Sequence, residues 1–190
     1  MFGSEYNGCQ IFIFQDDYAE NPRQWASLGT ILSIDEANEA SAQAVKTVRD
    51  DVNSGRSIER ALKAQFPDMV WYHPIYRYTH GGSVWALHDN FPDRRWDVSQ
   101  CGFVIVTRGE IKSWFKRQRM SQGLSDRIYN TVAESLKSFT KWANGDVWAF
   151  RVSGSGIIDL DDIVYGWYDS PQEALDNAEA MIDDMKESAE

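Results

Sequence analysis

The residues able to do chemistry in this sequence gather between Tyr72 and Val106. The stretch holds all three histidines, one of the two cysteines and an arginine pair, namely His73, His80, His88, Cys101, Arg94 and Arg95. Histidine, cysteine and carboxylate side chains are the groups that zinc sites and nucleophilic catalysis use. If the chain has a site for an enzymatic reaction, we expect it here.

Two kinds of site can be built from these residues. His80 and His88 lie across an expected β-hairpin, and with Asp97 or Cys101 they could complete a zinc site. Alternatively, Cys101 could act as a nucleophile that His80 activates and Asp97 orients. However, the sequence has no C-x-x-C or H-E-x-x-H signature, and Cys101 begins an apolar strand, where a thiol is usually inert. We therefore predict no catalytic residue, no metal and no cofactor, and keep a small Cys/His-dependent hydrolase or metal enzyme centred on 72–106 as the alternative.

Hydrophobic patterning predicts the elements that position this stretch. Strands are expected at 9–15, 28–34, 101–107, 146–152, 157–160 and 161–168, with a hairpin over 70–87 that turns at Gly81 and Gly82. The polar segment from Asn90 to Gln100 is expected to be a loop. The predicted fold class is α+β: a single domain over 1–190, with a mostly antiparallel sheet, about four to five helices and an acidic amphipathic helix at the C-terminus.

Helix starts are marked by capping residues. Ser33 with Glu36 and Thr107 with Glu110 have the spacing of a capping box, and Ser57 precedes an amphipathic segment. Ser170-Pro171-Gln172-Glu173 combines an N-cap, a proline at the first helical position and a glutamate two residues later. Helices are therefore expected at about 35–52, 58–66, 107–117 and 124–143, and from 171 onward.

The net charge of −10 arises entirely from the last part of the chain. Residues 1–158 carry 18 acidic and 18 basic side chains, whereas residues 159–190 carry 11 acidic side chains against Lys186 alone. The expected C-terminal helix has an apolar stripe of Leu175, Ala178, Ile182 and Met185. Its like charges three or four residues apart cost roughly 0.2–0.5 kcal/mol per pair, a cost that a positively charged partner would offset.

We predict that this helix and the middle of the 90–100 segment bind a partner. The predicted partner-binding residues are Asp169, Glu173, Asp176, Glu179, Asp183, Asp184, Glu187, Asp93, Arg94, Arg95 and Trp96. An acidic solubilising helix with no partner is the plainer interpretation of the same charges. Six basic residues between Arg108 and Arg127 could contact nucleic acid, but the acidic end argues against direct nucleic-acid binding. With no apolar run of roughly 20 residues and no export signal, we expect a cytoplasmic protein with two reduced cysteines and no membrane contact.

Several short pieces of the sequence resemble a family of small proteins from phages, plasmids and other mobile elements. They are Asp17, Asn21-Pro22-Arg23, Trp25, Leu28-Gly29-Thr30, Pro74-Ile75-Tyr76, His80-Gly81-Gly82, Trp96-Asp97, Gln100-Cys101-Gly102-Phe103-Val104, Gly145-Asp146-Val147-Trp148 and Gly166-Trp167-Tyr168. Acidic proteins of such elements include antirestriction and anti-CRISPR proteins, some of them DNA mimics. The resemblance implies an inhibitor of host defence that binds a basic surface of a host protein or nucleoprotein complex, such as a CRISPR effector or a restriction enzyme.

Overall fold

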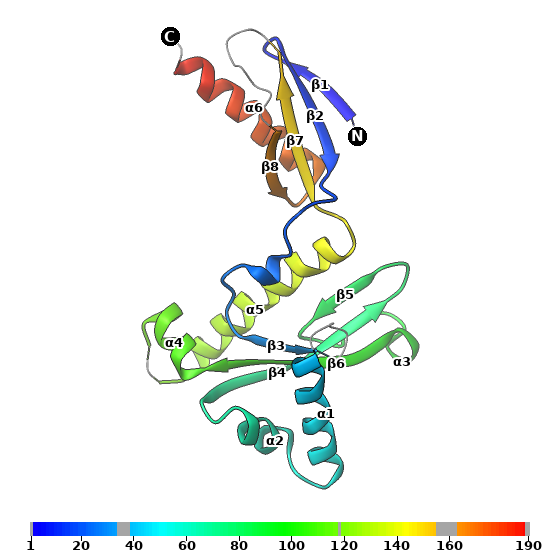
Figure 1. Ribbon diagram of the computed structural model, residues 1–190, viewed down its shortest axis with the longest axis vertical. Coiled ribbons are helices and arrows are strands. Elements are labelled where there is room, and N and C mark those ends of the chain that lie inside the picture. The colour runs from blue at the N-terminus through cyan, green and yellow to red at the C-terminus, as the bar shows by residue number, and fades with distance from the viewer. Residues whose placement is uncertain (1, 34–38, 118, 155–162, 189–190) are drawn as a thin grey trace. The chain divides into compact units, whose positions relative to one another are not determined.

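The computed structural model describes residues 2–33, 39–117, 119–154 and 163–188 (Figure 1). These residues form six α-helices, one 3₁₀ turn and eight strands, and the strands make two antiparallel sheets. The predicted α+β class is confirmed, with one helix more than the four to five expected. Across the described ranges, no helix has both the length and the apolar character needed to cross a membrane.

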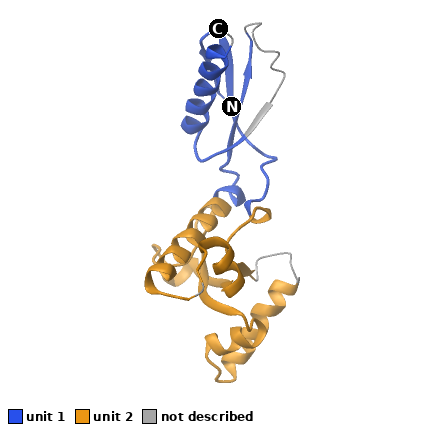
Figure 2. Ribbon diagram, turned by 90° about the vertical axis from the view of Figure 1, so that its left-hand side faces the viewer, with its two compact units in different colours: residues 1–22, 141–190 blue, residues 23–140 orange. Residues whose placement is uncertain are grey.

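The chain divides into two compact units (Figure 2). Unit 1 comprises residues 1–22 and 141–190, and unit 2 comprises residues 23–140. Unit 1 carries 16 acidic and 3 basic side chains, a net charge of −13, whereas unit 2 carries 13 acidic and 16 basic side chains, a net charge of +3. The structural division is therefore also a division of charge. That the two units behave as a single domain stays a prediction.

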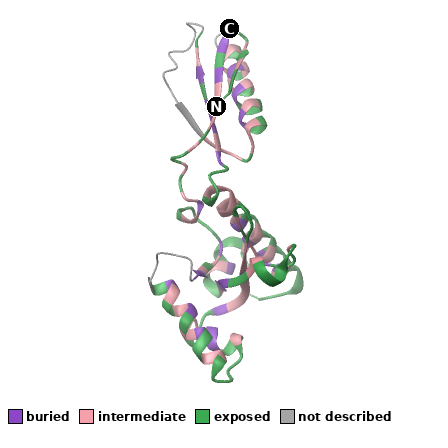
Figure 3. Cartoon of the chain, turned by 90° about the vertical axis from the view of Figure 1, so that its right-hand side faces the viewer, coloured by how far each residue is buried: buried purple, intermediate pink, exposed green. Residues whose placement is uncertain are grey.

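Unit 1 is a four-stranded sheet covered by one helix. Its strands are β1 (Phe2–Tyr6), β2 (Cys9–Gln15), β7 (Trp148–Ser153) and β8 (Ile163–Tyr168), in the order β1-β2-β7-β8. Helix α6 (Pro171–Glu187) packs on this sheet with Ala174, Ala178 and Ile182 buried, one residue per turn (Figure 3). This stripe shares Ala178 and Ile182 with the predicted one, but its third buried member is Ala174, whereas Leu175 and Met185 are half-buried.

Unit 2 has a sheet with helices on both faces. The strands are β3 (Thr30–Ser33), β4 (Met69–Thr79), β5 (Ser83–Ala86) and β6 (Val98–Thr107), in the order β3-β6-β4-β5. One core cluster includes Ile128, Val132 and Leu136 of α5 (Gln122–Ala143), and the other includes residues of α1 (Glu39–Asn53) and α2 (Ile58–Gln65). Two buried faces explain why β6 is apolar at consecutive positions, as expected for a central strand.

The predicted helix starts are borne out where the structure describes them. Ser57 accepts a hydrogen bond from the Arg60 amide at the start of α2, and Ser170 accepts one from the Glu173 amide at the start of α6. Thr107 and Glu110 form the full capping box that opens α4 (Arg108–Phe115). The Ser33–Glu36 box lies partly outside the described residues, and the strand expected at 157–160 lies wholly outside them.

The expectation for the 90–100 segment is wrong. In place of a loop, residues Arg94–Asp97 form the short helix α3, and β6 begins at Val98. The polar residues Ser99 and Gln100 misled the prediction because they are exposed near the start of β6, where this strand pairs with β4 from Tyr76 to Tyr78. Strand β1 was also missed, although Asn7-Gly8 between β1 and β2 is a hairpin signal: both residues have positive φ (51° and 82°).

Candidate interaction surfaces

The histidine-rich stretch forms a row of stacked rings beside the β4–β5 hairpin. The ring of His80 lies 6.0 Å from that of Tyr78, Tyr78 lies 5.0 Å from Phe91, and Phe91 lies 5.0 Å from His88, all between ring centroids. The Nδ1 atom of His80 is 3.1 Å from a carboxylate oxygen of Asp97. His80 and His88 therefore flank one aromatic pair, and two of the three residues that the enzyme alternative requires, His80 and Asp97, lie together.

The third residue, Cys101, does not join them. Its side chain is 2% exposed in the core cluster of α5, and its thiol donates to the carbonyl of Ile75 at 3.6 Å. A thiol that solvent does not reach cannot meet a substrate, so Cys101 does not fit the role of a nucleophile. His73 is not part of this row of rings either: its ring stacks on that of Trp71 and lies edge-on to that of Tyr129. In the described part of the chain, no three His, Cys, Asp or Glu residues are grouped to hold a metal ion.

Both thiols are expected to resist modification in the folded protein. Cys9 and Cys101 lie buried in the cores of different units and form no disulfide with each other. Reaction with a thiol reagent then requires opening of a core, so we expect it to be on the order of 10³-fold slower or more in buffer than in denaturant. The Cys9→Ala variant assigns the remaining signal to Cys101. Rapid reaction of that variant in buffer would contradict the buried position and restore the enzyme alternative.

The four residues predicted to bind a partner in the 90–100 segment lie on or beside α3. Arg94 forms an ion pair with Asp89, and the guanidinium of Arg95 lies 5.3 Å from the centre of the Trp96 ring. Asp93 precedes the helix in a left-handed conformation, with φ of 51°. Trp96 is 80% exposed and is the exposed large apolar side chain of this segment. These residues belong to unit 2, whereas the seven predicted acidic residues belong to unit 1.

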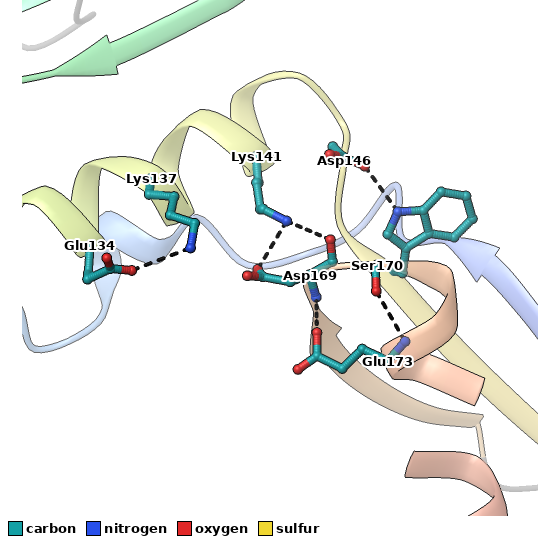
Figure 4. A network of polar contacts seen from close by, with 8 residues as sticks. Glu134, Lys137, Lys141, Asp146, Asp169, Ser170 and Glu173 are labelled. Atoms are coloured by element: carbon teal, nitrogen blue, oxygen red, sulfur yellow. Dashed lines mark hydrogen bonds and ion pairs between the residues drawn. The ribbon is translucent and has the colours of Figure 1, made fainter. Parts of the chain in front are cut away.

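Three of the seven acidic residues hold unit 1 together. Lys141 donates to the backbone carbonyl of Asp169 at 2.5 Å and lies 3.4 Å from its carboxylate (Figure 4). The Glu173 carboxylate accepts from the Asp169 amide at 2.7 Å (Figure 4). Asp183 accepts from the hydroxyl of Tyr6 and from the amide of Asn7, both at 2.9 Å. The hydrogen bond to Asp183 raises the pKa of Tyr6 above its ordinary value of 10.0.

The other four form the outward surface of α6, which we call the acidic face: Asp176, Glu179, Asp184 and Glu187. Asp176, Asp184 and Glu187 are exposed and Glu179 is half-buried. Asp176 accepts from the amide of Gln172, and no ion pair joins any of the four to a described cation. The one lysine of the helix, Lys186, donates to the backbone carbonyl of Asn7 at 2.7 Å and is thus turned toward the β1–β2 turn. Within the described residues, no cationic side chain therefore pairs with the carboxylates of the acidic face.

Unit 2 carries the opposite feature, which we call the basic patch: Arg108, Lys112, Lys116, Arg117, Arg119 and Arg127. All six are exposed, on α4, on the segment that follows it and on the first turns of α5. They surround three open depressions of about 800, 470 and 450 Å³. The first two share Arg119 and Met120 and therefore adjoin. The spacing of the six cations was visible in the sequence, but the depressions were not.

Comparison of the chain with protein-family models, curated proteins and solved structures finds no match in any of the three. The resemblance of short sequence pieces to proteins of mobile elements therefore stays an interpretation of those pieces.

Proposed function

We propose that this chain is a non-enzymatic interaction protein whose acidic face binds a basic, nucleic-acid-binding surface of a host protein or nucleoprotein complex. Binding there would inhibit a defence system of the restriction or CRISPR class in the cytoplasm of a bacterial host. The observation that carries the proposal is the uncompensated acidic face on a unit of net charge −13.

The position of α6 supports a rigid surface. Ala174, Ala178 and Ile182 fix the helix on the sheet, while Asp183 and Lys186 attach its last turns to Tyr6 and Asn7. Carboxylates held on a fixed helix can meet a cationic surface without a large loss of side-chain and backbone entropy. A surface built to bind phosphates presents lysine and arginine, which also pair with carboxylates. The acidic face is therefore suited to occupying such a surface in the manner of DNA.

Reversing three exposed charges of the acidic face is expected to abolish binding. We choose Asp176→Lys, Asp184→Lys and Glu187→Lys and leave Asp183 intact, because Asp183 holds Tyr6 and Asn7. The tagged triple variant should retain its host partner from a bacterial lysate less well than the unchanged protein, by on the order of tenfold or more, as electrostatic pairing would become repulsion. Retention is measured at 50 and 300 mM salt, and excess duplex DNA should release the partner if a nucleic-acid site is occupied.

The matched control is Asp50→Lys, Asp126→Lys and Glu134→Lys, three exposed carboxylates of unit 2. It makes the same change in net charge and is expected to keep the partner. If the control loses the partner equally, the effect belongs to net charge and not to α6. A partner that the α6 variant still retains, or that DNA does not displace, would contradict the proposal.

A further inference from the structure

The basic patch has no internal partner for its charge. In the described part of unit 2, four other cations form ion pairs, among them Arg56 with Asp51 and Lys63 with Glu59. By contrast, none of the six patch residues makes an ion pair with any residue that the structure describes. Cations that are gathered on one surface and left unpaired repel one another, and an anionic ligand relieves that repulsion.

Two carboxylates adjoin the patch in sequence, Glu110 and Asp126, and Asp126 accepts from the side-chain amide of Gln122 at 2.8 Å. Glu110 on α4 accepts from the Thr107 amide and hydroxyl, both at 2.7 Å, and from the Gly29 amide at 3.0 Å. Its charge is therefore used to cap the helix and to hold the residue before β3. No acidic residue of the described ranges lines any of the three depressions. Among the described residues, the three depressions are therefore lined by cations without a carboxylate beside them.

Helix α4, which carries Arg108 and Lys112 of the patch, also exposes an aromatic side chain. Trp114 is 45% exposed on α4, between Lys112 and Lys116 in the sequence. The guanidinium of Arg127 lies 4.9 Å from the centre of the Phe115 ring, which holds this arginine against α4 beside the largest depression. Arginine can bind phosphate oxygens through two parallel N–H donors, and an exposed indole can stack on an unpaired base.

We propose that the basic patch binds single-stranded nucleic acid, with the arginines and lysines on the phosphodiester backbone and Trp114 on a base. This inference does not rest on the acidic face, because the patch belongs to unit 2, whose own net charge is +3. It departs from the expectation drawn from the total charge of −10, in which the acidic end of the chain opposed nucleic-acid binding. An anionic polymer fits better than a small anion because the cations extend over three depressions.

Fluorescence anisotropy with a labelled 20-nucleotide oligothymidine tests the proposal on the full chain. If the six cations contact six phosphates, a plot of log association constant against log salt concentration should have a slope of about −4. The affinity should then fall by about 10²-fold between 50 and 200 mM salt. Arg117→Gln with Arg119→Gln and Arg127→Gln should lower affinity at least tenfold and bring the slope to about −2. Trp114→Ala should weaken binding of the oligothymidine by roughly tenfold and leave duplex binding nearly unchanged.

The control is Lys46→Gln with Arg49→Gln and Arg60→Gln, which removes three exposed cations from α1 and α2 of the same unit. It should bind as the unchanged protein does, and circular dichroism should show that all variants are folded. The proposal is overturned if the control and the patch variant lose affinity equally, or if no binding occurs at 50 mM salt. It is also overturned if polyglutamate competes as well as the oligonucleotide, since the patch would then be a site for acidic protein.

Discussion

Replacing Ile182 by alanine is expected to lower the free energy of unfolding of unit 1 by about 2–5 kcal/mol. Ile182 is fully buried between α6 and the sheet, where it packs in one cluster with Ile11, Phe150 and Val152. Because α6 contacts this sheet along a single stripe whose other buried members are alanines, Ile182 supplies the largest fully buried side chain of the helix. Urea denaturation with circular dichroism measures the loss, and Ile182→Val should cost only about 0.5–1.5 kcal/mol.

A companion substitution tests the prediction of a single domain. Ile128→Ala removes a fully buried side chain from the α5 core of unit 2 and should cost a similar amount. If residues 1–190 unfold as one domain, the protein shows a single unfolding transition, and both variants shift it whichever spectroscopic signal is followed. If the units unfold separately, each variant shifts one of two transitions. An Ile182→Ala protein as stable as the unchanged one would contradict the packing of α6 on the sheet.

The elements that could be predicted from the sequence are those set by local chemistry. Thr107 with Glu110, and Ser170 with Glu173, form caps within one helical turn, so no knowledge of the rest of the chain was needed. The continuous apolar run of β6 likewise indicated burial on both faces. Such signals were sufficient for the α+β class and for most of the helix starts.

The division into units could not be predicted because it depends on contacts distant in sequence. Strand β2 pairs with β7, so that Gln10 lies opposite Ser153, and Asp183 binds Tyr6 across 177 positions. These contacts join both ends of the chain into unit 1 and assign the four acidic residues at positions 1–22 to the same unit as α6. Counting charge along the sequence located the acidic helix, but it did not reveal that residues 23–140 have a positive balance of their own.

The choice of candidate site residues also depends on contacts between residues that are distant in the sequence. Residue types alone suggested His80, Asp97 and Cys101 as candidates for an enzymatic site. In the structure His80 contacts Asp97, whereas Cys101 is buried in the core. Among the acidic residues, Asp183 was indistinguishable in the sequence from Asp184. One holds Tyr6, and the other is exposed on the acidic face. Which carboxylates serve the fold and which remain for a partner follows only from the tertiary contacts.

Replacing Gly102 by alanine is expected to destabilise unit 2 by about 3 kcal/mol, the upper end of the usual cost of overpacking. Gly102 lies on β6 opposite Ser33 of β3, and an added Cβ would overlap the backbone carbonyl of Leu32. A flexible side chain could rotate away, but a strand carbonyl can move only if β3 and β6 separate. Leu32 and Phe103 belong to the core cluster at this point, so separation would also open the core.

Gly123 in α5 provides the matched control, because an added Cβ there meets no atom within 4 Å. Gly123→Ala should leave stability unchanged or raise it by up to about 1 kcal/mol, since alanine loses less backbone entropy in a helix. The two variants make the same chemical change in one unit, so their difference in urea midpoint isolates the close approach of β3 to β6. Equal stability of the two would mean that the strands accommodate a side chain at Gly102, and that this glycine is not needed for their spacing.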